Sequence, residues 1–164
     1  MKKKKVLFFC EDNATRSLIA EAVFRHLCEG EWDVYSAGAC SKAPHPAMLR
    51  ALAERGIGTS ELVSKTTDEL PYHRFDLLVT LSANTTDAQL DGVNSDFKVE
   101  LPFVDPAGWG GSDEGQSRVF RQVRDQIYGR LSVLCHRVNT AGLASLQPLH
   151  TRETNGLAWC SANL

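Results

Sequence analysis

The sequence predicts a single-domain α/β protein in which helices cover both faces of a four-stranded parallel sheet. Short strand patterns alternate with helical patterns along the chain, the order that βαβ units produce. The 164 residues fit one domain with a sizeable core, and the apolar and charged fractions (43% and 23%) are ordinary for a globular protein. We expect a domain over residues 1–140 and a C-terminal tail of unknown role over residues 141–164, which show no clear periodicity.

The elements follow from the periodicity of the apolar residues. Four short apolar runs are the expected strands: Lys5–Phe9, Trp32–Ala37, Asp76–Leu81 and Phe97–Leu101. Apolar residues three and four apart predict three helices: Ser17–Cys28, His45–Arg55 and Glu114–Asn139. A glycine follows each helix at or near its end, as helix C-caps favour. Two further segments are expected to form short helical turns: Thr67–Leu70 and Thr85–Leu90.

The stretch between the first strand and the first helix is the most informative of the chain. It reads Cys10-Glu11-Asp12-Asn13-Ala14-Thr15-Arg16-Ser17. A loop that joins a strand end to a helix N-terminus directs several backbone N–H groups at one point, and such a nest binds a tetrahedral oxyanion. These donors should hold the thiol of Cys10 as a thiolate, with a pKa well below the free value of about 8.5. The fork of Arg16 matches two oxygens of a phosphate-like ion.

Other residues of this loop have expected roles as well. Ser17, at the helix start, can donate a hydrogen bond to the thiolate. Asn13 is expected to take a positive φ and to tie the loop together. The carboxylates of Glu11 and Asp12 are expected to raise the pKa of Cys10 and to weaken anion binding.

A second candidate residue, Asp105, follows the fourth predicted strand. The carboxyl ends of parallel strands meet at one edge of a sheet, where ligands of this fold class bind. Cys10 ends the first strand, so the two distant residues are expected to meet over one anion.

Composition and charge limit the kinds of partner and cofactor that we expect for this protein. The net charge of −2 gives no electrostatic footprint for nucleic acid, and no segment approaches the length that spans a membrane. The basic run over residues 2–5 is no secretory signal, and five scattered cysteines suggest no disulfide framework, so we expect a cytoplasmic protein. Neither the histidines nor the cysteines have the spacing of a metal site, and we expect no bound cofactor. The sequence carries no signal for a particular oligomeric state.

The motif Cys10-x5-Arg16-Ser17 after a hydrophobic strand resembles the low-molecular-weight protein tyrosine phosphatases and the arsenate reductases that share their flavodoxin-like fold. The resemblance covers about residues 5–140. Four further segments support it: Ala20-Glu21-Ala22, Ser36-Ala37-Gly38, Val79-Thr80-Leu81 and Asp105-Pro106. It implies that Cys10 is the nucleophile, that Arg16 stabilises the attacked centre, and that Asp105 protonates the leaving oxygen. It also implies that residues 11–17 form the oxyanion-binding loop.

Details of the resemblance favour the arsenate reductase branch. The phosphatases usually place tyrosines just after Asp-Pro, where this chain has Ala107 and Gly108. One departure matters, because the thioredoxin-linked reductases carry two further cysteines at the positions of Ser82 and Gln89. A hydroxyl and an amide cannot form a disulfide, so the resemblance implies an external thiol such as glutathione with glutaredoxin.

The potassium-binding reductases use a set of side chains that this chain keeps in part. Their positions match Asn13, Glu21 and Ser36, but a fourth ligand, an Asp, matches Lys65. We expect the ammonium of Lys65 to take the place of the ion.

Three functions stay open at this point. The first is arsenate reduction, in which Cys10 attacks arsenate and a second thiol releases arsenite. The second is hydrolysis of phosphomonoesters through a phosphocysteine at Cys10. The third is a non-catalytic module that binds oxyanions or senses redox state. Cys40 and Cys160 are possible resolving thiols, whereas Cys28 and Cys135 are expected to be packing residues.

Overall fold

The computed structural model describes residues 2–146 of the chain. The strands are β1 (Lys4–Cys10), β2 (Trp32–Gly38), β3 (Arg74–Thr80) and β4 (Asn94–Glu100). The α-helices are α1 (Arg16–Leu27), α2 (Pro46–Ala53) and α3 (Asp113–Thr140). The 3-10 helices among the described residues are η1 (Thr67–Glu69), η2 (Asp87–Leu90), η3 (Pro106–Gly108) and η4 (Leu143–Leu146).

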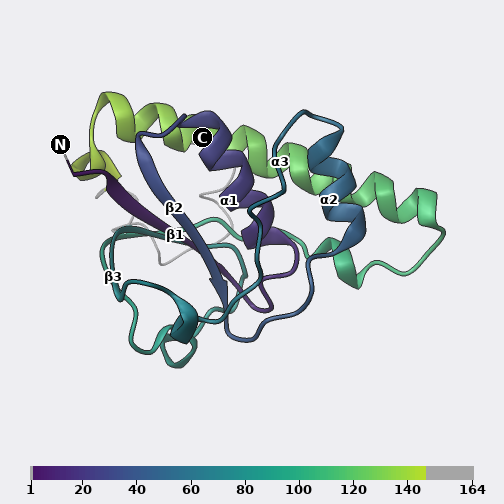
Figure 1. Cartoon of the computed structure of the whole chain (residues 1–164), viewed down its shortest axis with the longest axis horizontal. Coiled ribbons are helices and arrows are strands. Elements are labelled where there is room, and N and C mark those ends of the chain that lie inside the picture. The colour runs from purple at the N-terminus through teal and green to yellow at the C-terminus, as the bar shows by residue number, and fades with distance from the viewer. Residues whose placement is uncertain (1, 147–164) are drawn as a thin grey trace.

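The strands form one parallel sheet in the order β2-β1-β3-β4, which confirms the predicted α/β class (Figure 1). The chain leaves β1 toward β2 on one side and later returns to β3 on the other side. The carboxyl end of β1 therefore lies at the point where the strand order reverses, which is where ligands bind in this fold class. The register sets Cys10, the last residue of β1, beside Gly38, the last residue of β2.

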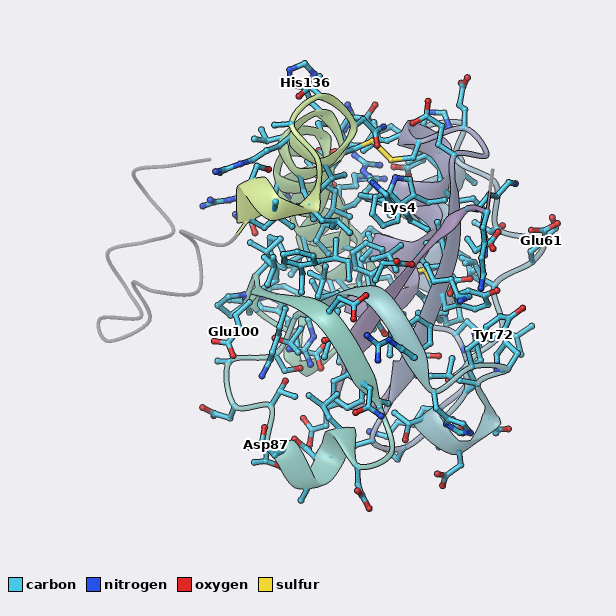
Figure 2. The ribbon with its side chains drawn as sticks, turned by 90° about the vertical axis from the view of Figure 1, so that its left-hand side faces the viewer. Lys4, Glu61, Tyr72, Asp87, Glu100 and His136 are labelled. Carbon is cyan, nitrogen blue, oxygen red and sulfur yellow. A yellow bond between two sulfur atoms is a disulfide. The ribbon has the colours of Figure 1, made fainter. Side chains whose placement is uncertain are left out.

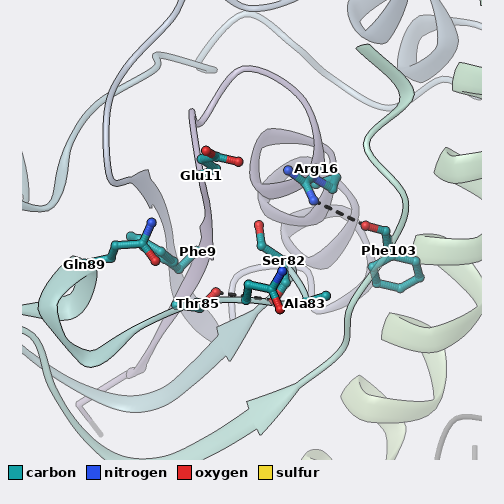
Figure 3. Close-up of a pocket in the computed structure, with 9 residues that line it drawn as sticks. Phe9, Glu11, Arg16, Ser82, Ala83, Thr85, Gln89 and Phe103 are labelled. Atoms are coloured by element: carbon teal, nitrogen blue, oxygen red, sulfur yellow. Dashed lines mark hydrogen bonds between the residues drawn. The ribbon is translucent and has the colours of Figure 1, made fainter. Parts of the chain in front are cut away.

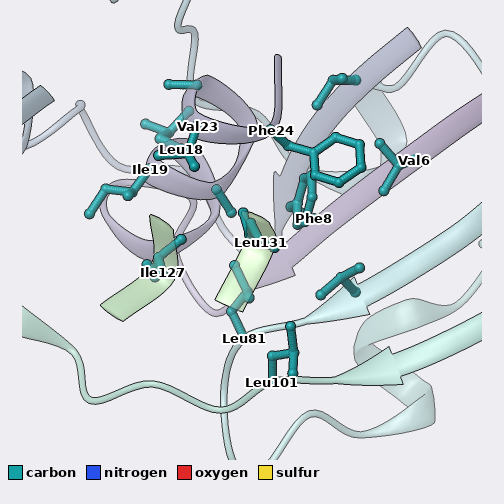
Figure 4. Close-up of a cluster of buried hydrophobic side chains, with 14 of the residues drawn as sticks. Val6, Phe8, Leu18, Ile19, Val23, Phe24, Leu81, Leu101, Ile127 and Leu131 are labelled. Atoms are coloured by element: carbon teal, nitrogen blue, oxygen red, sulfur yellow. The ribbon is translucent and has the colours of Figure 1, made fainter. Parts of the chain in front are cut away.

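One face of the sheet carries the main core and all three α-helices. Val6 and Phe8 of β1 point into it, and the ring of Phe8 lies 5.4 Å from that of Phe24 on α1. Ile127 and Leu131 of α3 close the same cluster, which Figure 4 shows. Burying each of these side chains contributes about 1.5–3 kcal/mol, so β1 and α1 are held firmly on either side of the loop that joins them.

The opposite face carries a smaller core under short 3-10 helices. Leu7 and Phe9 of β1 pack there against Leu70 and Leu90, which lie at the ends of η1 and η2. These are the two helical turns predicted from the sequence, and a threonine capping box begins each of them. Only short 3-10 helices among the described residues therefore cover this second face. One of them, η2, lies near the carboxyl end of β1.

The edge strand β4 begins three residues earlier than the predicted strand Phe97–Leu101. Its first half, Asn94–Asp96, is polar and mostly exposed, so no apolar run marks it in the sequence. The backbone pairing with β3 places it in the sheet nevertheless, from Arg74 beside Asn94 to Thr80 beside Glu100.

Cys28 and Cys135 form a disulfide between the end of α1 and α3, which corrects the expectation of no disulfide framework. The bond joins residues 107 positions apart, and its two yellow sulfur atoms are drawn in Figure 2. Both side chains are also buried in the main core, as packing residues are. Sequence spacing could not reveal the pair, because only the packing of α1 on α3 brings the two thiols together.

The described chain ends with η4, which packs against α3 and β4. Its last residue, Leu146, is fully buried in the main core. The tail predicted to begin at residue 141 lies outside the described residues from position 147 onward. No helix within residues 2–146 has both the length and the hydropathy needed to cross a membrane.

Candidate active site

The loop between β1 and α1 wraps tightly because two residues allow it. Asn13 has a φ of 46°, the left-handed conformation expected for it from the sequence. Gly38 lies against the loop, and a Cβ on it would stand 2.7 Å from the Asn13 nitrogen and 2.5 Å from the Cys40 carbonyl oxygen. Only glycine fits so close to the loop backbone.

A buried hydrogen-bond network fixes the thiol at the start of this loop. The Sγ of Cys10 lies 2.8 Å from the Oγ of Ser17, and the Nδ2 of Asn13 donates to the same Oγ at 2.7 Å. Asn13 also donates to Ser36 Oγ at 3.0 Å and accepts from the backbone N–H of Lys65 at 2.8 Å. When Cys10 is a thiolate, the hydroxyl of Ser17 holds the only proton between the two atoms and therefore donates to the sulfur.

The environment of Cys10 differs from the expectation in one respect. Burial raises the pKa of the Cys10 thiol above its ordinary value. The hydrogen bonds from Ser17 act in the opposite direction, as do the charge of Arg16 and the backbone N–H of Asn13, but burial outweighs them. The sequence indicated the donors correctly, whereas the complete burial of the sulfur becomes visible only in the folded chain.

The two carboxylates of the loop lie in different surroundings. Asp12 turns back on the loop, where its Oδ1 accepts the N–H of Ala14 at 3.2 Å and its Oδ2 lies 3.5 Å from the ammonium of Lys42. Glu11 is exposed. Burial is the main cause of the rise in the Cys10 pKa, so the expected effect of these carboxylates stays a prediction.

Arg16 and Asp105 meet at the other side of the loop, although 89 residues separate them. The Nη2 of Arg16 lies 3.5 Å from Asp105 Oδ2, and its Nη1 donates to the carbonyl of Phe103 at 3.3 Å. The Oδ1 of Asp105 accepts from the hydroxyl of Thr15 at 3.2 Å and from the N–H of Ala107 at 3.0 Å. The structure thus brings together the predicted charge clamp and the predicted acid at one sheet edge.

The residues matched to an ion site also lie together. Glu21 is buried on α1, and the hydroxyl of Ser36 donates to its Oε2. The ammonium of Lys65 lies 3.9 Å from the same oxygen and donates to the carbonyl of Val63 at 2.8 Å. The sequence interpretation missed Arg25, whose guanidinium donates to Glu21 Oε1 at 2.6 Å. The i, i+4 spacing of the two residues on one helix was the available signal.

Of the two possible resolving thiols, the structure describes one. Cys40 is exposed and follows the tight turn after Gly38, where its N–H donates to the carbonyl of Glu11 at 3.0 Å. Its Sγ lies 3.7 Å from the same carbonyl oxygen, so this thiol borders the loop. Cys160 lies outside the described residues.

A pocket of about 350 Å³ opens beside the loop (Figure 3). Phe9 and Glu11, the residues on either side of Cys10, both line it, together with Arg16. The opposite wall comes from the segment after β3, with Ser82 and Gln89 among its residues. These are the two positions that the sequence resemblance matches to the relay cysteines of thioredoxin-linked reductases, but nothing in the sequence indicated that both line one cavity.

Comparison with known proteins supports the same interpretation. The family model for low molecular weight phosphotyrosine protein phosphatase matches residues 5–144. An arsenate reductase of Halalkalibacterium halodurans is 38% identical over 131 residues, which cover 80% of this chain and 94% of that protein.

Solved structures agree with this result. A structure titled an arsenate reductase in the phosphate binding state has a TM-score of 0.66 and 27% identity, and covers 82% of this chain and 98% of its own. A thioredoxin-dependent arsenate reductase of Corynebacterium glutamicum has a TM-score of 0.60 and 25% identity, covering 85% of this chain and 63% of its own. The relatives and the placement of Cys10 indicate a cysteine-based enzyme. The chain belongs to the low molecular weight phosphotyrosine protein phosphatase family.

Proposed function

We propose that this protein is an arsenate reductase in which Cys10 attacks arsenate and an external thiol completes the reduction to arsenite. The observation that carries the proposal is the position of the Cys10 sulfur. It lies at the start of an anion-binding loop, 2.8 Å from the Ser17 hydroxyl, and the loop ends at Arg16 beside Asp105. The curated relatives named arsenate reductase support the choice of oxyanion.

In the first step the loop holds arsenate by its backbone N–H groups and by the guanidinium of Arg16. The present contacts of that guanidinium, at 3.3 and 3.5 Å, are long, so an arsenate oxygen can compete for its donors. The Cys10 thiolate then attacks arsenic, an S–As bond forms, and an As–O bond breaks. Asp105 gives the proton with which the departing oxygen leaves as water.

In the second step an external thiolate attacks the Cys10 sulfur. An S–S bond forms, the S–As bond breaks, and its electron pair stays on arsenic, which leaves as arsenite after taking up protons from solvent. A second thiol then reduces the mixed disulfide and restores the Cys10 thiolate. In sum, arsenate gains two electrons from two thiols, and the products are arsenite, water and a disulfide.

The cysteines of the chain favour an external thiol. Ser82 and Gln89 occupy the positions of the relay cysteines, and Cys28 and Cys135 are bonded to each other. Within residues 2–146 this leaves Cys40 as the free thiol besides Cys10. The Corynebacterium glutamicum neighbour is thioredoxin-dependent, which supports thiol dependence in this family. We infer that the reductant is glutathione with glutaredoxin, or a similar small thiol of the cytoplasm.

Phosphomonoester hydrolysis is the second candidate. The contact between Asp105 and Arg16 favours it, because an acid beside the anion clamp is what a leaving alcohol requires. Hydrolysis also needs no second thiol, in keeping with the residues at positions 82 and 89.

The two functions separate in one experiment. The purified full chain is incubated with arsenate and glutathione plus glutaredoxin, and arsenite is measured; a parallel sample receives p-nitrophenyl phosphate without thiol. The proposal predicts arsenite that depends on the thiol and disappears in Cys10→Ser. Hydrolysis without any arsenite supports the phosphatase instead. Anion-induced thermal stabilisation with no turnover of either substrate supports a binding module.

A further inference from the structure

The candidate acid lies on a connection that has few side chains to hold it. Residues 101–112 join β4 to α3, and the part after Pro106 reads Ala-Gly-Trp-Gly-Gly-Ser. Glycine loses more backbone freedom on folding than any other residue, so a segment this rich in glycine is poorly fixed by its own backbone. Trp109 is the one large side chain between positions 107 and 112. Its contacts therefore decide how firmly this part of the connection is held.

The anion loop holds the Asp105 end of the connection only in part. The hydroxyl of Thr15 donates to Asp105 at 3.2 Å. The guanidinium of Arg16 lies 3.5 Å from the same carboxylate and donates to the carbonyl of Phe103 at 3.3 Å (Figure 3). In the proposed function arsenate takes the donors of Arg16, so Asp105 loses this partner when it must face the departing oxygen. An anchor away from the anion loop can hold Asp105 through this step.

A single 3-10 turn joins Asp105 to Trp109. Asp105 caps η3 by accepting the N–H of Ala107 at 3.0 Å, and its backbone carbonyl accepts the N–H of Gly108 at 3.4 Å. At the other end, the N–H of Trp109 donates to the carbonyl of Pro106 at 3.4 Å. Pro106 is buried, and its ring fixes φ at the start of the turn. The carboxyl group and the indole thus lie at the two ends of one short unit, so a shift of Trp109 also moves Asp105.

The indole of Trp109 lies in a notch formed by two glycines. A Cβ on Gly111 would stand 2.3 Å from the indole Cζ3, and a Cβ on Gly115 would stand 2.4 Å from the indole Cη2. Only residues without a Cβ leave room for the ring so close to the backbone. Gly115 belongs to the first turn of α3, where Ser112 accepts its N–H at 3.2 Å, and α3 packs into the main core. The notch therefore gives a fixed position to a side chain that is 42% exposed.

We propose that Trp109 is a positioning residue for Asp105: its indole, held against Gly111 and Gly115, anchors η3 on α3 and keeps the carboxyl group beside the anion loop. The proposal rests on the proposed function, because the proton that Asp105 gives to the departing oxygen belongs to its first step. Trp109 takes no part in the chemistry itself. The effect of removing it should therefore reach the reaction through Asp105 alone.

The first test measures the order of the connection and needs no turnover. Hydrogen exchange of the full chain is followed on the millisecond scale in peptides that cover residues 101–111 and residues 5–17. Trp109→Ala removes the indole, whereas Gly115→Ala fills the notch and leaves the indole in the chain. In both variants we expect exchange over residues 101–111 to become about ten-fold faster, because the turn opens more often, and exchange over residues 5–17 to stay the same.

Gly129→Ala is the matched control for the filled notch. Gly129 lies on the same helix as Gly115, and a Cβ on it meets no atom within 4 Å. Alanine raises the helix propensity at either position, so the blocked notch is what separates the two variants. Unchanged exchange over residues 101–111 in Trp109→Ala overturns the proposal, and so does an equal rise in Gly115→Ala and Gly129→Ala.

The second test asks whether Trp109 acts through Asp105. Arsenite formation is measured at saturating arsenate and thiol in the native chain, in Trp109→Ala, in Asp105→Asn and in the double variant. We expect Trp109→Ala to lower kcat about 10- to 100-fold, as a small misplacement of a catalytic group does, and Trp109→Phe to recover most of the loss. In the Asp105→Asn background, Trp109→Ala should leave kcat unchanged, because the group that Trp109 positions is already gone.

An equal loss of kcat in both backgrounds overturns the proposal, because Trp109 then acts on another group or on the fold as a whole. If the native chain yields no arsenite but hydrolyses phenyl phosphate, the same four chains are compared on that ester, whose leaving alcohol also requires the acid. Faster exchange over residues 101–111 in Trp109→Ala, with no arsenite from any chain, means that the proposed function fails while the anchoring of Asp105 by Trp109 stands.

Discussion

Removal of the Ser17 hydroxyl offers the sharpest test of how this fold activates its thiol. The Oγ of Ser17 lies 2.8 Å from the Cys10 sulfur inside the protein, and it receives a hydrogen bond from Asn13 at 2.7 Å. In Ser17→Ala the thiolate loses a charge-assisted hydrogen bond worth about 1.5–3 kcal/mol. At 1.36 kcal/mol per unit, the pKa of Cys10 should rise by about one to two units.

The direction of the pH effect follows from the sign of this shift. Burial raises the pKa of Cys10, and because the thiolate is the nucleophile, the reactivity of Cys10 increases as the pH rises toward that pKa. Ser17→Ala should move this increase to higher pH. Below both pKa values the thiolate fraction, and with it kcat/KM, should fall about 10- to 100-fold.

The assay is the rate of Cys10 alkylation by iodoacetamide against pH, measured by peptide mass spectrometry so that exposed Cys40 is counted separately. Ser36→Ala is the matched control, because its hydroxyl accepts from the same Asn13 amide at 3.0 Å without touching the sulfur. The reasoning is refuted if Ser17→Ala and Ser36→Ala give the same alkylation profile as the native chain.

Three further substitutions test separate parts of the site. Asp105→Asn removes the proton donor beside Arg16 and should lower kcat by about 10²–10⁴-fold. Thermal stabilisation by arsenate should persist in this variant, because arsenate binding does not need the proton. An unchanged kcat argues against the role of Asp105 as an acid. Gly38→Ala places a Cβ 2.5 Å from the Cys40 carbonyl and should destabilise the fold by about 1–3 kcal/mol, seen as a lower urea midpoint; the reasoning on this glycine is wrong if the midpoint stays the same. Lys65→Asp removes the ammonium 3.9 Å from Glu21, so potassium should stimulate turnover of this variant and not of the native chain; the reverse pattern contradicts an ammonium in place of the ion.

The fold class and the order of the elements could be predicted because they follow from local patterns. The apolar run before Cys10, the helical spacing of α3 and the order of elements all lie within short windows of sequence. The rule that parallel strands end at one edge predicted that Asp105 lies at the same sheet edge as the loop after Cys10, and the structure places Asp105 beside Arg16 of that loop. The polar start of β4 escaped because backbone pairing, and not an apolar pattern, places an edge strand.

Other features depend on packing between distant segments. The pairing of Cys28 with Cys135 exists because α1 packs on α3, and no spacing rule connects them. The burial of the Cys10 sulfur also depends on how the core closes around the loop, so the direction of its pKa shift was expected wrongly. The pocket between Glu11 and Ser82 joins two loops that are far apart in the chain. Sequence could supply its residues but not the space between them.

The species trapped after a single turnover tests the central claim most directly. The protein is mixed with arsenate and one equivalent of glutathione, quenched in acid, and examined by intact and peptide mass spectrometry while arsenite is quantified. The account predicts one arsenite per chain and a mixed disulfide between Cys10 and glutathione. A disulfide between Cys10 and Cys40 contradicts the external thiol, and the absence of both arsenite and any modification of Cys10 contradicts arsenate reduction itself.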